Sequence, residues 1–235
     1  MRAYILKPLN IENKIDKHGI MLACDTVYFN NWAKILFFSI KNHAPWAHIH
    51  FHLFDPTDED RGWISKQDCT FSSEQTPVEY ANDKEKSILY WATARYTRFT
   101  EIYIDSTVAI DLDCDSIMVK DLDYSTFMKD MERSWVPIAP KRAQLSLCSA
   151  LGFGADNTRY ILRDRYLKAK DTNDWFWTFD QRLVDKMIEA GEIQTMNLKY
   201  TDYKFKEDSY VWTGKGERVY RSRFKEAMAK YHHLI

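Results

Sequence analysis

The sequence predicts an α/β domain, and three observations lead to this fold class. Residues 20–24 form an uninterrupted apolar run, which is typical of a buried strand, and residues 31–42 after it have helical spacing. Residues 108–119 alternate between apolar and acidic side chains, as a half-buried strand does. Residues 83–99, without Gly or Pro, form a long helical pattern just before that acidic strand. A strand, a short loop and a helix in this order open an α/β unit.

The composition limits the class of function. The chain has 235 residues, and its charged fraction of 29% is ordinary for a globular protein. Its formal net charge of −1 gives no overall basic footprint, so we expect no nucleic-acid partner. The four cysteines are far apart, which argues against a disulfide scaffold or a zinc ribbon. We find no transmembrane run and no signal-peptide pattern, and therefore expect a cytoplasmic protein.

The remaining pattern indicates one domain without repeats or linkers. Residues 1–18 are expected to be an N-terminal extension and residues 19–235 the domain. Asn30 fits the N-cap position of the helix at 31–42. A short helix near 58–66 and a loop are expected within 55–80. Further strands are expected at 135–139 and 145–153, and further helices at 157–169, 179–190 and about 219–231.

Residues 48–54 alternate as a second strand that places three imidazoles on one face. His48, His50 and His52 could in principle bind a metal ion. On a flat strand, however, side chains at every second position point apart. We therefore favour a partly exposed strand face that carries imidazoles.

The acidic face of the strand at 108–119 predicts a metal site. Asp111, Asp113 and Asp115 share this face, and apolar side chains occupy the other. Carboxylates this close raise one another's pKa values, and a divalent cation removes the conflict. Mn²⁺ and Mg²⁺ prefer oxygen ligands, and Mg²⁺ commonly takes one or two carboxylates together with substrate phosphates. The alternative is an acidic turn after a strand, without a metal.

Two basic segments flank the acidic strand. Lys84, Arg95 and Arg98 lie in one narrow arc of the helix at 83–99, together with Trp91. They form either a solvated basic face or a wall for an anionic ligand beside the metal, and Trp91 slightly favours the wall. In the loop at 214–216, Lys215 lies between two glycines, so that backbone and charge could both approach a phosphate. The loop does not have the spacing of a P-loop.

Taken in order, these motifs resemble the nucleotide-sugar glycosyltransferases of the GT-A fold, and most closely glycosyltransferase family 8, the glycogenin and galactosyltransferase-like group. The resemblance implies a single Rossmann-like domain with a central mixed, mostly parallel sheet flanked by helices. It runs from about residue 19 to residue 231 and rests on Asp25-Thr26-Val27-Tyr28, Tyr90-Trp91-Ala92-Thr93-Ala94-Arg95-Tyr96, Leu112-Asp113-Cys114-Asp115, Asp180-Gln181 and Trp212-Thr213-Gly214-Lys215-Gly216.

The resemblance implies roles around the donor diphosphate. Asp113 and Asp115 match the family's Asp-x-Asp, which binds Mn²⁺ or Mg²⁺ against the diphosphate. Arg95 matches an arginine that contacts the nucleotide sugar, and Lys215 matches a lysine that touches the departing diphosphate. Lys84 is a further candidate for this charge.

Other matches concern the base and the sugar. Asp25 and Tyr28 match the base pocket, where the tyrosine ring can stack on uracil. Asp180 and Gln181 match a pair that faces the transferred sugar. One departure is that Thr213 occupies the position of the histidine that usually completes the metal ligands. Asp111 or a water molecule could take the place of that histidine.

The function implied is metal-dependent transfer of a hexose from a nucleoside diphosphate sugar, preferably a UDP-sugar, with retention of configuration. The glycan, lipid-glycan or protein acceptor is not identified, although Trp175 and Trp177 could stack on a sugar ring. Two alternatives stay open. Thr213 is compatible with a nucleotide-sugar or glycan-binding module without turnover. A sugar-phosphate nucleotidyltransferase would usually carry a Gly-rich loop near the N-terminus, where this chain has residues 24–27 instead.

Overall fold

Strand β1 (Gly19–Asp25) lies inside the central sheet of the computed structural model, which describes residues 9, 13–138, 148–171 and 179–235. Within these residues the sheet has seven strands in the order β3-β2-β1-β4-β7-β6-β8. Strand β7 runs antiparallel to both of its neighbours, and the other paired strands are parallel. The predicted mixed, mostly parallel sheet is therefore confirmed. The remaining strands are β2 (His48–Phe54), β3 (Thr70–Glu74), β4 (Ala109–Leu112), β6 (Trp135–Pro137), β7 (Ala150–Phe153) and β8 (Gln194–Met196).

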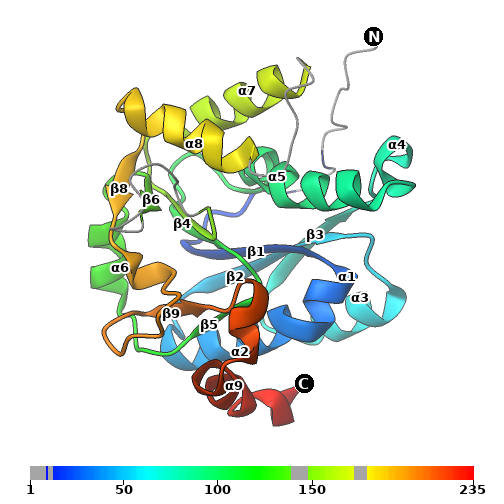
Figure 1. The fold of residues 1–235 in the computed structure, drawn as a ribbon, viewed down its shortest axis with the longest axis vertical. Coiled ribbons are helices and arrows are strands. Elements are labelled where there is room, and N and C mark those ends of the chain that lie inside the picture. Colours follow the sequence, from blue (N-terminus) through cyan, green and yellow to red (C-terminus); the bar gives the residue numbers. More distant parts are fainter. Residues whose placement is uncertain (1–8, 10–12, 139–147, 172–178) are drawn as a thin grey trace.

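Helices cover both faces of this sheet (Figure 1). One face carries α5 (Lys84–Ile102), α7 (Thr158–Asp171) and α8 (Phe179–Glu189), whose apolar side chains pack in one cluster. The other face carries α2 (Lys34–His43), α3 (Asp58–Ile64) and α6 (Tyr124–Asp130).

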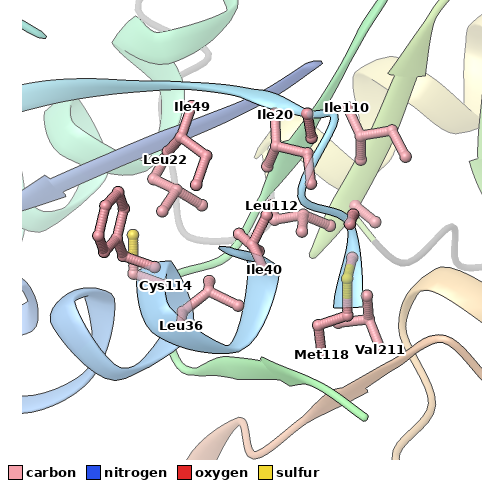
Figure 2. Packing of buried hydrophobic residues seen from close by; sticks show 14 of the residues in the cluster. Ile20, Leu22, Leu36, Ile40, Ile49, Ile110, Leu112, Cys114, Met118 and Val211 are labelled. Carbon is pink, nitrogen blue, oxygen red and sulfur yellow. The ribbon is translucent and has the colours of Figure 1, made fainter. Parts of the chain in front are cut away.

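Successive side chains along a strand are buried in opposite layers. Ile20 and Leu22 of β1 pack in the α2 layer, and Met21 between them packs in the α5 layer. Figure 2 shows Leu112 and Cys114 of the acidic segment in the same cluster as Ile20 and Leu22. The apolar face predicted for residues 108–119 is thus confirmed.

The first helical run begins earlier than predicted. It starts with α1 (Thr26–Tyr28), continues through a π-helical turn (Phe29–Ala33) and passes into α2. The Asp25 carboxylate caps it by accepting a 2.8 Å hydrogen bond from the backbone N–H of Tyr28. Asn30 lies inside the run, where its side-chain amide donates to the Thr26 carbonyl at 2.9 Å. The prediction of Asn30 as the N-cap was therefore wrong.

Strand β3 was missed, because residues 70–74 were expected to be a loop. The segment TFSSE lacks an apolar alternation and is only partly covered, since it pairs with β2 alone. Its polar side chains bond to the imidazoles of β2: Thr70 and Ser72 both contact His50, at 2.9 Å each. His50 and His52 are 3% and 0% exposed, so a partly exposed face was the wrong expectation for them.

A second, two-stranded antiparallel sheet joins β5 (Ser116–Met118) to β9 (Val211–Thr213). The predicted strand at 108–119 is therefore two strands, with residues 113–115 between them. After β9 come a 3₁₀ turn (Gly216–Tyr220) and α9 (Ser222–Ala229), so the last long helix is shorter than predicted. The pairing of β5 with β9 brings the loop at 214–216 beside the acidic turn.

The other predicted elements agree with the structure where it describes them. Helix α3 lies within 58–66, α7 within one or two residues of 157–169, and α8 within 179–190. Gly191 follows α8 with φ +70°, a conformation that favours glycine. Residues 1–8 and 10–12, part of the expected strand at 145–153, and Trp175 and Trp177 lie outside the described residues. None of the helices described combines the length and apolar character that a membrane crossing requires.

Candidate functional site

The candidate site lies where β1 and β4 end side by side. These two strands are parallel, so Asp25 and the turn after Leu112 lie at the same edge of the sheet. Along the chain the strands run outward from β1 through β2 to β3 and then return to the other side of β1 as β4. Ligands of open α/β sheets bind at such a switch point, outside the carboxyl ends of the strands.

Asp113 is held between two cations. Its Oδ1 accepts a 2.7 Å hydrogen bond from Arg95 Nη1, and Lys215 Nζ lies 3.7 Å from Oδ2. Its backbone N–H donates to the Ser149 carbonyl at 2.8 Å, which fixes the turn against the chain that leads into β7. Burial alone would raise the pKa of Asp113, but the charges of Arg95 and Lys215 hold this pKa below its usual value. Asp113 is thus an ionised carboxylate at neutral pH.

Asp115 is a buried carboxylate whose charge Lys215 and Arg95 compensate only in part. It is 6% exposed, and no other residue in the described part of the chain hydrogen-bonds to its side chain. Burial, together with the charge of Asp113, raises its pKa to about 7. A divalent cation would remove this penalty, so the pair Asp113 and Asp115 fits Mn²⁺ or Mg²⁺ by the chemistry of its donors.

Asp111 lies on the same side of the chain as Asp113, since both carboxylates contact the Arg95 guanidinium. Strand β4 ends at Leu112, so Asp113 and Asp115 lie in the turn that follows it. The side chain of Asp111 is 1% exposed, and its Oδ2 lies 3.2 Å from Arg95 Nε. Burial raises its pKa to about 6 despite the nearby guanidinium. Arg95 bridges Asp111 to Asp113, which makes Asp111 a partner of Arg95; its replacement of a metal ligand stays a prediction.

The hydroxyl of Thr213 is hydrogen-bonded to two other hydroxyl groups. Its Oγ1 lies 3.1 Å from Ser116 Oγ and 3.0 Å from Thr201 Oγ1, and the residue is fully buried. Both contacts of its hydroxyl are thus with other side chains of the protein. Over the described residues no three His, Cys, Asp or Glu side chains are arranged to hold a metal ion. A cation here would therefore take two protein carboxylates, with phosphate or water oxygens as its other ligands.

Tyr28 lies at the end of β1, and the residue is 45% exposed. Burial raises the pKa of its phenol, and the charges of Asp115 and Asp113 raise it further, which places the ring near both. Asp25 holds the backbone of Tyr28 through the capping bond described above, and burial raises the pKa of Asp25. Both residues lie where β1 ends, and their role at a base pocket stays a prediction.

Asp180 reaches the site from the first turn of α8. Its Oδ2 accepts a 3.3 Å hydrogen bond from the Tyr96 hydroxyl, and that hydroxyl accepts from Arg95 Nη2 at 3.2 Å. The charge of Asp180 also contributes to raising the pKa of Lys215, after the larger effect of Asp113. Gln181 follows in α8 and is half-buried. The structure thus brings Asp180, Arg95 and Lys215 together.

The predicted basic wall is reduced to one residue of α5. Lys84 is exposed in the first turn of the helix, and Arg95 follows eleven residues later, about 16 Å along the axis. Arg98 lies deeper and pairs with Glu74 and Glu101. Of the three cations, Arg95 is the one that the described contacts join to the aspartates.

One site residue was missed from the sequence. The Tyr203 hydroxyl lies 2.6 Å from Ser149 Oγ, and the guanidinium of Arg218 stacks 5.0 Å from its ring centre. Burial raises the pKa of Tyr203, with opposing contributions from Asp113 and Lys215. Its sequence neighbourhood carries no motif, since its position depends on the loop between a 3₁₀ turn and β9.

No protein-family model matches this sequence, and no curated protein matches it either. Among solved structures, the chain is similar to a crystal structure of the galactosyltransferase LgtC in complex with donor and acceptor sugar analogs. The two share 12% sequence identity with a TM-score of 0.62, over 90% of this chain and 95% of that one. Together with the sheet order, this similarity shows that the chain has the GT-A fold.

Proposed function

We propose that the protein is a metal-dependent glycosyltransferase that moves a hexose from a UDP-sugar to an acceptor, with retention of configuration. One observation carries the proposal: Asp115, buried and without a partner within the described chain, lies beside an ionised Asp113 at the switch point of a GT-A fold. The solved structure similar to this chain is a galactosyltransferase with donor and acceptor analogs, which supports the same class of reaction.

Asp113 and Asp115 would hold Mn²⁺ or Mg²⁺, which neutralises the charge that grows on the departing diphosphate. Arg95 is 6% exposed at its side chain and is bonded to Asp113, Tyr96 and the Cys148 carbonyl. We therefore assign Arg95 to positioning Asp113, in contrast to the direct contact with the donor that the resemblance implies.

Lys215 is the cation that we assign to the departing diphosphate. Its side chain is 44% exposed and its Nζ is 3.7 Å from Asp113, which is longer than a hydrogen bond. It is protonated at neutral pH, because Asp113 raises its pKa. Lys215 can thus move onto a phosphate oxygen and stabilise charge where it develops.

Tyr28 and Asp180 would place the two ends of the donor. The exposed ring of Tyr28 offers a face for the uracil base, and Asp180 would orient the transferred hexose through its carboxylate. Gln181, on the same turn of α8, would accompany Asp180 at the sugar. Because Asp180 is held by Tyr96, we assign it an orienting role and not nucleophilic attack. The departing phosphate oxygen is the base that a front-face displacement would use.

A second candidate is a nucleotide-sugar or glycan-binding module without turnover. The observation that favours it is Thr213, whose hydroxyl is bonded to Ser116 and Thr201 and leaves the metal with only two protein ligands. Such a site would bind donor and cation weakly and release no sugar.

The deciding experiment is a donor screen. UDP-, GDP- and ADP-sugars are incubated with Mn²⁺, and the free sugar released by hydrolysis is measured alongside calorimetric binding. Release from a UDP-sugar that is lost in Asp115→Asn supports the transferase. The matched control is Asp68→Asn, whose carboxylate is 97% exposed in an ion pair with Lys41. Binding without release favours the module, and absence of nucleotide binding with all three donors would overturn both.

A further inference from the structure

A basic groove of about 550 Å³ opens beside the candidate site, with Lys215 in its lining. It is lined by residues of the 3₁₀ turn and the segment that enters α9: Lys215, Gly216, Glu217, Arg218, Tyr220 and Arg221. Three of these carry positive charge and one carries negative charge. A volume of this size is within the range of small-molecule sites.

The two arginines of the groove lack carboxylate partners within the described chain. Arg218 lies 5.0 Å from the ring centre of Tyr203 and donates from Nη1 to the Lys215 carbonyl at 3.2 Å. Arg221 lies 5.9 Å from the ring centre of Phe205. A ring positions a guanidinium without neutralising it, so both keep donors for an anion.

Arg223, two residues further on, is different. Its Nη2 lies 3.0 Å from Glu207 Oε1, and its guanidinium stacks on Trp212. Arg223 is thus paired with a carboxylate and lies outside the groove, whereas Arg218 and Arg221 line the groove and have no carboxylate partner in the described chain. The latter share the groove with the ring of Tyr220, which is 71% exposed and offers an apolar face.

We propose that this groove binds the acceptor through an anionic substituent, a phosphate or carboxylate carried by the acceptor sugar. The inference rests on the proposed function, since it names the acceptor class for the same site. Lys215 belongs to both places, because its Nζ lies 3.7 Å from Asp113 Oδ2 and the residue also lines the groove. An acceptor held at Arg218 and Arg221 would thus lie next to Lys215, the cation that we assign to the donor diphosphate.

The test fills the donor site first. Protein saturated with UDP and Mn²⁺ is titrated with glucose 6-phosphate, glucuronate and glucose by calorimetry. We expect the two anionic sugars to bind and glucose to bind at least about tenfold more weakly. Arg221→Gln should weaken the anionic sugars about fivefold or more without changing UDP affinity, because two charge-assisted hydrogen bonds are lost. Preference for the phosphate or the carboxylate identifies the substituent.

Arg223→Gln is the matched control and should bind the anionic sugars as the unchanged protein does. Equal affinity for glucose and the anionic sugars would overturn the proposal, as would an equal loss in Arg221→Gln and Arg223→Gln. If UDP itself does not bind, the titration is repeated on nucleotide-free protein carrying Lys215→Gln. Binding of glucose 6-phosphate that still depends on Arg221 then supports the groove while the glycosyltransferase proposal fails, and its absence overturns the groove.

Discussion

Two arginines one turn apart on α5 lie in two buried ionic clusters. The charges of one cluster are paired within the chain, and the other cluster has an excess of negative charge. Arg98 binds both oxygens of Glu74, which also accepts from His52 and from the Tyr90 hydroxyl. Burial would raise the pKa of Glu74, but these hydrogen bonds lower it to about 2. This cluster is satisfied by the chain itself, so its role is structural.

Arg95 lies in a cluster with an excess of negative charge. It bridges Asp111 and Asp113, with Asp115 nearby and only a half-exposed Lys215 as a further cation. Burial raises the pKa of Asp111 to about 6 and that of Asp115 to about 7. The comparison teaches that burial of carboxylates does not by itself mark a site. A site is marked where the protein leaves that charge uncompensated.

The largest effect expected from this comparison is the loss of turnover in Asp115→Asn. The substitution removes one of the two carboxylates that we propose as metal ligands. It should lower the rate of sugar release at saturating Mn²⁺ by about 10³-fold or more, since metal stabilisation of the departing charge contributes several kcal/mol. The free energy of unfolding without metal should not fall, because the substitution removes a buried, unpaired charge. Turnover is measured by sugar release and stability by urea unfolding at pH 8. Retained turnover, or a large loss of stability, would contradict the distinction between the two clusters.

Glu74→Gln should give the opposite result. It removes the buried carboxylate that pairs with Arg98, whereas Glu101 is 28% exposed at its side chain, so we expect a loss of about 3 kcal/mol in unfolding free energy. UDP binding by the folded protein should stay within about twofold of the unchanged protein, since Arg98 does not reach the site. Urea unfolding and calorimetry at 10 °C measure the two quantities.

Glu101→Gln serves as the control for Glu74→Gln. It removes the partly exposed partner of the same arginine and should cost less than about 1 kcal/mol. Equal costs for the two substitutions would show that Glu74 is not the principal partner of Arg98.

The sequence predicted most of the layers of the fold, for a physical reason. Apolar runs such as residues 20–24 and the period of residues 83–99 report burial, which dominates the arrangement of layers. Strand β3 was missed because its stability comes from pairing with β2 and from polar contacts to imidazoles, which leave no hydrophobic pattern.

Details of the site could not be predicted where they depend on contacts between elements. Alternation placed Asp111 and Asp113 on one face, but it does not report that Asp111 is 1% exposed and paired with Arg95. Helical spacing placed Arg98 beside Arg95, but the two have partners on different elements. Tyr203 was missed because its neighbours come from residues 54 positions earlier and 15 positions later in the chain.

The double substitution Arg95→Met with Asp111→Asn tests the positioning role of Arg95. Arg95→Met alone should cost about 2 kcal/mol of unfolding free energy, because Asp111 then stays buried without a cation. Adding Asp111→Asn should recover most of this stability. The rate of sugar release should stay about tenfold below that of the unchanged protein, since Asp113 has lost the hydrogen bond that orients it. Recovery of both quantities together would show that Arg95 acts only on stability.

The smallest effect expected is a difference in pH dependence, with opposite signs for the two regions. Burial lowers the pKa of His50 well below 6.5, so at lower pH the unfolded chain takes up a proton that the folded chain does not. The contribution of His50 to the free energy of unfolding is therefore present above pH 6.5 and is lost as the pH falls. Asp115 has a raised pKa, so its contribution is present below about pH 4 and is lost as the pH rises toward 7. Between pH 7.5 and 5.5, His50→Gln should therefore lose about 1 kcal/mol less than the unchanged protein, and Asp115→Asn about 1 kcal/mol more. Urea unfolding at both pH values measures these differences, and changes of the same sign in the two variants would show that the clusters do not differ in the way their charges are compensated.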